Sequence, residues 1–321
     1  MIVDDPQALL FTDVFLRLRG ILRATEVVLK LEGFSITGSI KIKTAKYLIA
    51  DIETRGLATP GKTTLVESSS GNLGVALSFL CHRLGYRFVC VTDPHASRVN
   101  LRAMDAYGAE IVVVDQPDQN GGYVHSRLLY IENLLRDPSY VWLNQYANPA
   151  NISAHAETTA SEILAAFPAP DYVILGAGST GTLMGCARRF REASPRTRLV
   201  AVDPEGSISF GGRSGRRVIA GIGSSRRPEL LDTDVVDHVV SVPEADTIRM
   251  CHEVVHNHGI LIGGSTGTVL AAARTLEGVI EPGASVIAVS ADFGDKYLDT
   301  IYDRLWVQEN FGFDPRAALA R

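Results

Sequence analysis

The stretch Tyr172–Cys186, YVILGAGSTGTLMGC, contains three signals in a row: an uninterrupted apolar run, a glycine-rich turn and the start of an apolar helical pattern. An apolar run without alternation is typical of a strand covered on both faces, as in a parallel sheet. A turn of this kind between strand and helix is where open α/β sheets bind their ligands. The stretch therefore predicts one strand–loop–helix unit of a ligand-binding parallel sheet.

The same pattern recurs along the rest of the chain. Further short runs rich in valine, isoleucine and leucine lie at 63–72, 87–94, 110–117, 198–206 and 285–294. Segments with helical spacing of apolar residues lie between them, at 73–84, 97–107, 183–193 and 266–276. This alternation predicts an α/β fold with doubly wound, mainly parallel sheets. The polar stretch NQYANPANISAH at 144–155 is the best break, so we expect one α/β domain over residues 1–155 and a second over 156–321.

Composition excludes several classes of protein. The chain has 321 residues, of which 46% are hydrophobic and 21% charged, as in an ordinary globular protein of two domains. The net charge of −5 and the lack of a long basic run argue against a nucleic-acid partner. No apolar stretch reaches the roughly 20 residues of a membrane span, and the start MIVDDPQALLF is acidic where a signal peptide is basic. We therefore expect a cytoplasmic protein without a membrane partner.

Two features raise the question of a metal. The cysteines lack CxxC spacing and predict buried free thiols, with no disulfide and no zinc ribbon: Cys81, Cys90, Cys186 and Cys251. The segment His252–His256 reads HEVVH, the HExxH pattern of zinc peptidases. The next histidine, His258, stands only two residues on, directly before Gly259, and does not supply the third ligand. We therefore predict a solvated helix face there and no metal site.

The glycine-rich turn predicts an anion site. Residues 176–181, GAGSTG, follow a strand and open a helix, so their backbone N–H groups and the helix dipole form an anion cradle. The hydroxyls of Ser179, Thr180 and Thr182 add donors. The same residues match GxGxxG, and Asp203 ends the next strand where a dinucleotide fold keeps its ribose-binding acid. A phosphate is therefore expected, and a nicotinamide dinucleotide remains one of the alternatives.

Two further segments carry polar residues at helix starts. The loop 68–72, SSSGN, closes a strand and directs hydroxyls, an amide and backbone donors toward one small anion such as a carboxylate. Lys41 stands at the first turn of the helical segment IKTAKYLIADIE. In a cleft beside a helix N-terminus its pKa would be lowered, as imine formation and proton transfer at neutral pH require.

Together and in this order, these segments resemble the cysteine synthase family of fold-type II pyridoxal-phosphate (PLP) enzymes. The matching segments are GSIK (38–41), ESSSGNLG (67–74), NQYANP (144–149), GAGSTGT (176–182) and GGSTG (263–267). GIG at 221–223 and DFGDKYLDT at 292–300 fit further landmarks of the family. The resemblance implies a fold like that of the tryptophan synthase β-subunit, PLP as cofactor, small amino-acid substrates and a homodimer.

The resemblance also implies roles for single residues. Lys41 would hold PLP as a Schiff base and later carry the Cα proton. Asn72 would bond the 3′ oxygen of the cofactor, and Ser265 would face the pyridine nitrogen, which favours β-elimination over transamination. The cofactor phosphate would lie in the loop Gly178, Ser179, Thr180, Gly181 and Thr182. The substrate carboxylate would be bound by Ser69, Ser70 and Gln145.

The departures from the family pattern bear on the substrate. Members that make cysteine carry Thr where Leu73 stands and Phe where Tyr146 stands. ESSSGNLGVAL and Ser179 look more like the branch that makes N-(2-amino-2-carboxyethyl)-L-glutamate from O-phospho-L-serine and L-glutamate, through an aminoacrylate, on the way to 2,3-diaminopropionate for siderophores. A doubly charged leaving group needs cationic donors, for which Arg226 in the segment GIGSSRR is the candidate. The other arginine, Arg227, or Tyr146 would bind the extra carboxylate of the second substrate.

The alternatives differ in nucleophile and in class. A cysteine synthase that uses O-acetyl- or O-phosphoserine and sulfide is the nearest one. An NAD-dependent oxidoreductase built on GAGSTG and Asp203, and a catalytically silent partner-binding homologue, are the others.

Overall fold

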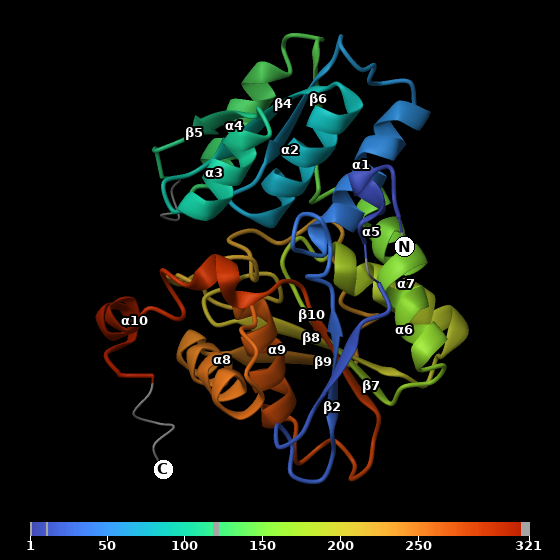
Figure 1. Ribbon diagram of the computed structural model, residues 1–321, viewed down its shortest axis with the longest axis vertical. Coiled ribbons are helices and arrows are strands. Elements are labelled where there is room, and N and C mark those ends of the chain that lie inside the picture. Colours follow the sequence, from blue (N-terminus) through green and yellow to red (C-terminus); the bar gives the residue numbers. More distant parts are fainter. Residues whose placement is uncertain (1, 11, 118–121, 316–321) are drawn as a thin grey trace.

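The apolar run that begins at Tyr172 forms strand β7 (Tyr172–Gly176) in the middle of a six-stranded sheet, in the order β1-β2-β10-β7-β8-β9. The computed structural model describes residues 2–10, 12–117 and 122–315 (Figure 1). The other strands of this larger sheet are β1 (Phe15–Leu18), β2 (Val27–Leu31), β8 (Arg198–Pro204), β9 (His238–Val242) and β10 (Val286–Ser290). Every neighbouring pair is parallel except β1 and β2.

Helices cover both faces of the larger sheet (Figure 1). One face packs against α8 (Glu244–His258) and α9 (Gly264–Thr275). The other packs against α7 (Gly181–Ala193) and against a helical run of α5 (Ala150–His155), the π-helical turn η2 (Ala156–Ala160) and α6 (Ser161–Ala166). The short 3-10 helix η3 (Gly294–Tyr297) and α10 (Arg304–Phe311) follow the last strand. Burial on both faces explains why these strands are apolar throughout.

The smaller sheet has four parallel strands in the order β5-β4-β3-β6. They are β3 (Thr64–Ser68), β4 (Arg87–Thr92), β5 (Glu110–Val113) and β6 (Tyr140–Trp142). Helices α1 (Lys41–Thr54), α2 (Asn72–Leu84) and α3 (Arg98–Ala106) share one apolar core with the sheet. Helix α4 (Val124–Leu134) packs on the opposite face, and the 3-10 turn η1 (Pro6–Ala8) lies near the chain start.

The predicted fold class, α/β with two mainly parallel sheets, is confirmed. The sheets do not follow the chain order at the predicted division near residue 155, however. Strands β1 and β2 lie well before residue 155 in the sequence but belong to the larger sheet. There β2 pairs with β10 on one side and with β1 on the other. Residues 15–31 therefore start the larger sheet, and the smaller sheet is built from the segment that follows.

The segments considered for metal binding have other partners. His252 Nε2 lies 2.9 Å from the carbonyl oxygen of Ile301, and Glu253 accepts two bonds from Arg274, at 2.7 and 2.6 Å. Within residues 2–10, 12–117 and 122–315, no three metal-ligating side chains gather into a site. The four cysteines are buried and unpaired. No helix in the described part of the chain is long and apolar enough to cross a membrane.

We expect Gly185→Ala to destabilise the protein by about 1–3 kcal/mol, because overpacking strains neighbouring groups. A Cβ at this position of α7 would lie 2.5 Å from the Ile152 carbonyl oxygen and 2.8 Å from the Ala156 nitrogen. Thermal unfolding of the variant and the wild type measures the loss. Gly278→Ala is the control, since its Cβ would meet no atom within 4 Å. Equal melting temperatures for Gly185→Ala and the wild type would contradict the packing described.

Candidate active site

The starts of three helices meet at one cavity between the two sheets. Lys41 begins α1, the loop before α7 contributes Gly178–Thr182, and Ser265 is the second residue of α9. All of them line the same cavity, whose remaining wall is apolar: Ile40, Leu175, Ile222, Val269 and Val289. The structure thus brings together seven of the residues predicted for the cofactor.

The loop before α7 has unused backbone donors. The first bond of the helix runs from the Met184 nitrogen to the Thr180 carbonyl oxygen. In the part of the chain that the structure describes, the backbone N–H groups of residues 178–183 donate to no protein acceptor. Thr180 takes a left-handed conformation with φ +65°, which opens the loop into the helix. These N–H groups at the positive end of the helix dipole are suited to a phosphate.

Lys41 is a buried amine without an opposite charge beside it. Burial lowers the pKa of Lys41 from 10.5 to about 8, and the carboxylate of Glu67 partly opposes this shift. No ion pair of Lys41 is found among the described residues. Its neutral form, the nucleophilic one, is therefore accessible near neutral pH.

Asn72 lies at the other side of the site, at the first turn of α2. Its Nδ2 donates to Asp292 Oδ2 at 2.7 Å, and its Oδ1 accepts from Lys296 Nζ at 2.7 Å. Lys296 also donates to the carbonyl oxygens of Thr37 and Gly38, close to Lys41 in the chain. Asp292 Oδ1 is buried without a hydrogen-bond partner, and burial raises the pKa of this carboxyl group. The amide of Asn72 is thus held in one orientation by Asp292 and Lys296, both in the segment that follows β10.

The side chains predicted to bind the substrate carboxylate, those of Ser69, Ser70 and Gln145, are bonded to other groups of the protein. Ser69 Oγ accepts from the backbone N–H of Gly74 at 3.0 Å, and Gln145 Nε2 donates to the Ser68 carbonyl at 3.0 Å. The Ser70 hydroxyl donates its single proton to Asp93 Oδ2 at 2.6 Å and accepts from Arg127. The N–H of Ser69 donates to the Val91 carbonyl oxygen and that of Gly71 to Ser69 Oγ. Among the described contacts, the N–H groups of Ser70 and Asn72 are the donors of the loop left for an anion.

Tyr146 lies between cationic groups from both sides of the site. Burial raises the pKa of Tyr146, whereas the charges of Arg127 and Arg226 lower it. The loop of Arg226 is tied to Tyr146 by a bond from the Leu230 nitrogen to the Tyr146 carbonyl oxygen, at 3.3 Å. Arg226 itself pairs with Glu229 at 2.5 Å, an exposed pair on its own loop. Such pairs are weak, so an anion in the site can displace Glu229.

Several site residues are absent from the sequence-based prediction. Asp93 follows strand β4 directly, and Arg127 lies on α4, buried in an ion pair with Asp93 at 3.1 Å. A polar residue at the end of a predicted parallel strand is a usable signal for Asp93, but α4 shows none for Arg127. Asp203, considered for a dinucleotide, lies outside the cavity lining; burial raises its pKa to about 6.

We expect Lys41→Met to stabilise the cofactor-free protein at pH 7. The amine of the unfolded chain keeps its usual pKa, so between pH 8 and 10.5 the unfolded state binds more protons and stability rises with pH. Below pH 8 the full cost, at most about 3 kcal/mol, opposes folding of the wild type. Melting temperatures at pH 7 and pH 10.5 test this, with exposed Lys46→Met as the control. No gain at pH 7, or an equal gain at both pH values, would contradict it.

Comparison with known proteins identifies the family. The family model described as "Pyridoxal-phosphate dependent enzyme" matches residues 14–292. A structure of an O-ureido-L-serine synthase variant with bound O-ureido-L-serine is 30% identical, with a TM-score of 0.88, covering 100% of this chain and 98% of that one. A second structure of that synthase has a TM-score of 0.86 at 30% identity, covering 100% of both chains.

A third similar structure is a hydrogen sulfide-producing enzyme from Fusobacterium nucleatum. It has a TM-score of 0.85 at 28% identity, and the match covers 92% of this chain and 100% of that one. The fold-type II architecture expected from the sequence is therefore confirmed. The cofactor is PLP, and the dinucleotide alternative is set aside. This chain belongs to the family of pyridoxal-phosphate dependent enzymes.

Proposed function

We propose that this enzyme performs a β-replacement on an O-substituted L-serine. The observation that supports it best is the single cavity that joins Lys41, the loop 178–182 and Ser265. PLP fits these residues, since free N–H groups suit its phosphate and a hydroxyl suits its pyridine nitrogen. Lys41 would bind the aldehyde carbon, Asn72 the 3′ oxygen and Ser265 the ring nitrogen. When bound, PLP withdraws electrons from the Cα of the amino acid.

The protein supplies a base for the Cα proton. Lys41 has a pKa of about 8, because burial disfavours its charged form. A base with a pKa near the working pH both accepts and returns a proton readily. A hydroxyl at Ser265 leaves the ring nitrogen uncharged, which favours loss of the β-substituent. We assign the α-carboxylate to the free N–H groups of Ser70 and Asn72, in the loop shaped by Ser69, Ser70 and Gln145.

The charges around Tyr146 support an anionic leaving group. O-phospho-L-serine carries nearly two negative charges on its phosphate, and Arg226 has only an exposed glutamate as partner. We therefore propose O-phospho-L-serine as the first substrate, with its phosphate on Arg226 and beside Tyr146. Arg127 is less suited, since buried Asp93 already compensates its charge.

For the nucleophile we propose the amine of L-glutamate, which gives N-(2-amino-2-carboxyethyl)-L-glutamate for 2,3-diaminopropionate and siderophore synthesis. The similarity of ESSSGNLG and Ser179 to that branch supports it. A cytoplasmic homodimer is part of the same proposal and follows from the family resemblance. The second candidate is a cysteine synthase that uses sulfide, which the hydrogen sulfide-producing relative favours.

Product analysis tests the proposed pair of substrates. The purified enzyme is given O-phospho- or O-acetyl-L-serine, each with L-glutamate or sulfide, and the products are identified by mass spectrometry. We expect the phosphoserine–glutamate pair to react at least about tenfold faster than any other pair, since one well-placed ionic hydrogen bond suffices for that factor. Faster formation of cysteine from acetylserine and sulfide would establish the second candidate instead.

Substitution of Arg226 tests the leaving-group site. We expect Arg226→Gln to lower kcat/KM for O-phospho-L-serine by about 10- to 100-fold, the effect of a lost charge-assisted hydrogen bond. The value for O-acetyl-L-serine, which lacks the charge, should change much less. Arg227→Gln, at the exposed neighbouring position, is the matched control. Equal losses with both substrates would show that Arg226 does not recognise the phosphate.

A further inference from the structure

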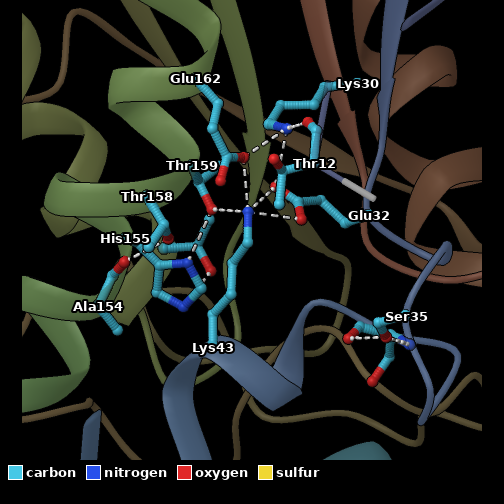
Figure 2. A network of polar contacts seen from close by, with 12 residues as sticks. Thr12, Lys30, Glu32, Ser35, Lys43, Ala154, His155, Thr158, Thr159 and Glu162 are labelled. Carbon is cyan, nitrogen blue, oxygen red and sulfur yellow. Dashed lines mark hydrogen bonds and ion pairs between the residues drawn. The ribbon is translucent and has the colours of Figure 1, made fainter. Parts of the chain in front are cut away.

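A cluster of four charged side chains is buried behind the active site, between β2, α1 and α6 (Figure 2). It contains Lys30 of β2, Glu32 directly after that strand, Lys43 of α1 and Glu162 of α6. Lys43 Nζ lies 2.8 Å from Glu32 and 2.7 Å from Glu162, and Lys30 Nζ lies 2.7 Å from Glu162. Two ammonium groups thus balance two carboxylates. Buried charges require such pairing, so Lys43 is held as an ammonium group that can only donate hydrogen bonds.

Lys43 has a third contact, which leads out of the cluster. Its Nζ donates to Thr159 Oγ1 at 3.4 Å, and Thr159 Oγ1 lies 3.1 Å from His155 Nδ1 (Figure 2). Thr159 is completely buried, and His155 Nδ1 is the acceptor within its reach for the hydroxyl proton. With a proton received at Nδ1, a neutral imidazole carries its own hydrogen on Nε2. Burial and the charges of Lys41 and Lys43 lower the pKa of His155 well below its usual value, so the ring is neutral.

The chain of hydrogen bonds continues from His155 Nε2 toward the loop 178–182. Nε2 lies 2.9 Å from Thr44 Oγ1 and 3.3 Å from Thr182 Oγ1. Thr44 Oγ1 in turn donates to Asn151 Oδ1 at 3.1 Å. Asn151 Nδ2 donates to the Gln145 carbonyl oxygen at 2.8 Å and to Ser179 Oγ at 3.1 Å.

The other end of this hydrogen-bond chain, at the Gln145 carbonyl, independently requires the same direction of donation. The Gln145 carbonyl can only accept, so the amide nitrogen of Asn151 must face it and the amide oxygen must face Thr44. Thr44 then donates to Asn151 and is left to accept from His155 Nε2. An obligate donor at Lys43 and an obligate acceptor at Gln145 thus require one and the same arrangement of protons.

We propose that Lys43, acting through Thr159 and His155, is a positioning residue that turns the hydroxyl proton of Thr182 toward the cofactor phosphate, as Asn151 does for that of Ser179. Ser179 Oγ accepts from Asn151 Nδ2, and Thr182 Oγ1 shares with Thr44 Oγ1 the one hydrogen that His155 carries on Nε2. Both hydroxyls therefore keep their own protons for the loop. A phosphate has only acceptor oxygens, so it binds hydroxyls that present protons and is repelled by those that present lone pairs. The inference rests on the proposed assignment of the loop 178–182 to that phosphate.

The variant Thr159→Val interrupts the hydrogen-bond chain between Lys43 and His155 and leaves the four charged side chains in place. Only the Asn151 end then still favours a hydrogen on Nε2 of His155, so the tautomer with its hydrogen on Nδ1 becomes accessible. In that tautomer Nε2 accepts a proton from Thr44 or Thr182, and a Thr182 proton that turns to Nε2 is lost to the loop. The cofactor-free chain is titrated with PLP and, separately, with pyridoxal, which lacks the phosphate. We expect the affinity for PLP to fall about tenfold, as for one lost bond to a charged group, and the affinity for pyridoxal to stay unchanged.

Two matched variants serve as controls. Thr159→Ser restores the hydroxyl and should keep the wild-type affinity for PLP. Thr158→Val removes a neighbouring hydroxyl that bonds to the Ala154 carbonyl, outside the chain (Figure 2), and should not alter it either. The ³¹P chemical shift of bound PLP should move in Thr159→Val alone.

Other outcomes would overturn the proposal. An unchanged affinity of Thr159→Val for PLP would show that the hydrogen bonds from Lys43 do not orient the hydroxyl of the loop. An equal loss for PLP and pyridoxal would show a general structural defect. If the wild type itself bound PLP no better than pyridoxal, the assignment of the loop to the phosphate, and with it the proposed function, would fail.

Discussion

The convergence of helix N-termini on one small volume is the constraint on which the site depends. Helices α1, α7 and α9 begin at the cavity, and α2 begins at Asn72, which is bonded to Asp292 beside the start of α9. Each N-terminus has unsatisfied N–H groups and a partial positive charge. For α2 and α7 the parallel strands impose this arrangement, because a helix that directly follows a strand begins at the carboxyl edge of its sheet; α9 instead follows α8. Two sheets that face each other in this way produce a site that favours anions. A cofactor phosphate and a substrate carboxylate are anions of this kind.

Two lysines on the same helix illustrate how the partners of a buried amine decide its task. Lys41 forms no ion pair among the described residues, and burial lowers its pKa to about 8 against the opposing effect of Glu67, so that it can act as nucleophile and base. Lys43, two residues on, is paired with Glu32 and Glu162 and is thereby kept as a cation. The first amine is prepared for proton transfer and the second for donating hydrogen bonds in a fixed direction. The two roles differ because Lys43 of α1 has carboxylate partners from two other segments: Glu32, directly after β2, and Glu162 of α6.

The local part of this architecture could be predicted from sequence and the long-range part could not. The apolar runs and the glycine-rich loop identify strands, helix starts and the residues that the cavity brings together, because these signals lie within a few residues of one another. Strand β2 reads VVLKL, and the lysine at its fourth position makes this buried strand hard to recognise from sequence. The charge of Lys30 is compensated by nearby Glu32 and by Glu162, which is far away in the chain. The pairing of β2 with β10 and the role of Arg127 on α4 have the same origin. Ser70 shows the limit for a single residue, since its neighbour Asp93 decides where its proton points.

The central claim is that Lys41 is the residue that carries the cofactor. Borohydride reduction of the purified holoenzyme makes the bond between PLP and its protein amine permanent, and peptide mapping then locates the modified residue. The account predicts that the pyridoxyl group is found on Lys41, and that Lys43, although buried only two residues away, is unmodified. Modification of Lys43 or of another lysine, with Lys41 left free, would contradict the assignment of the cavity as the active site.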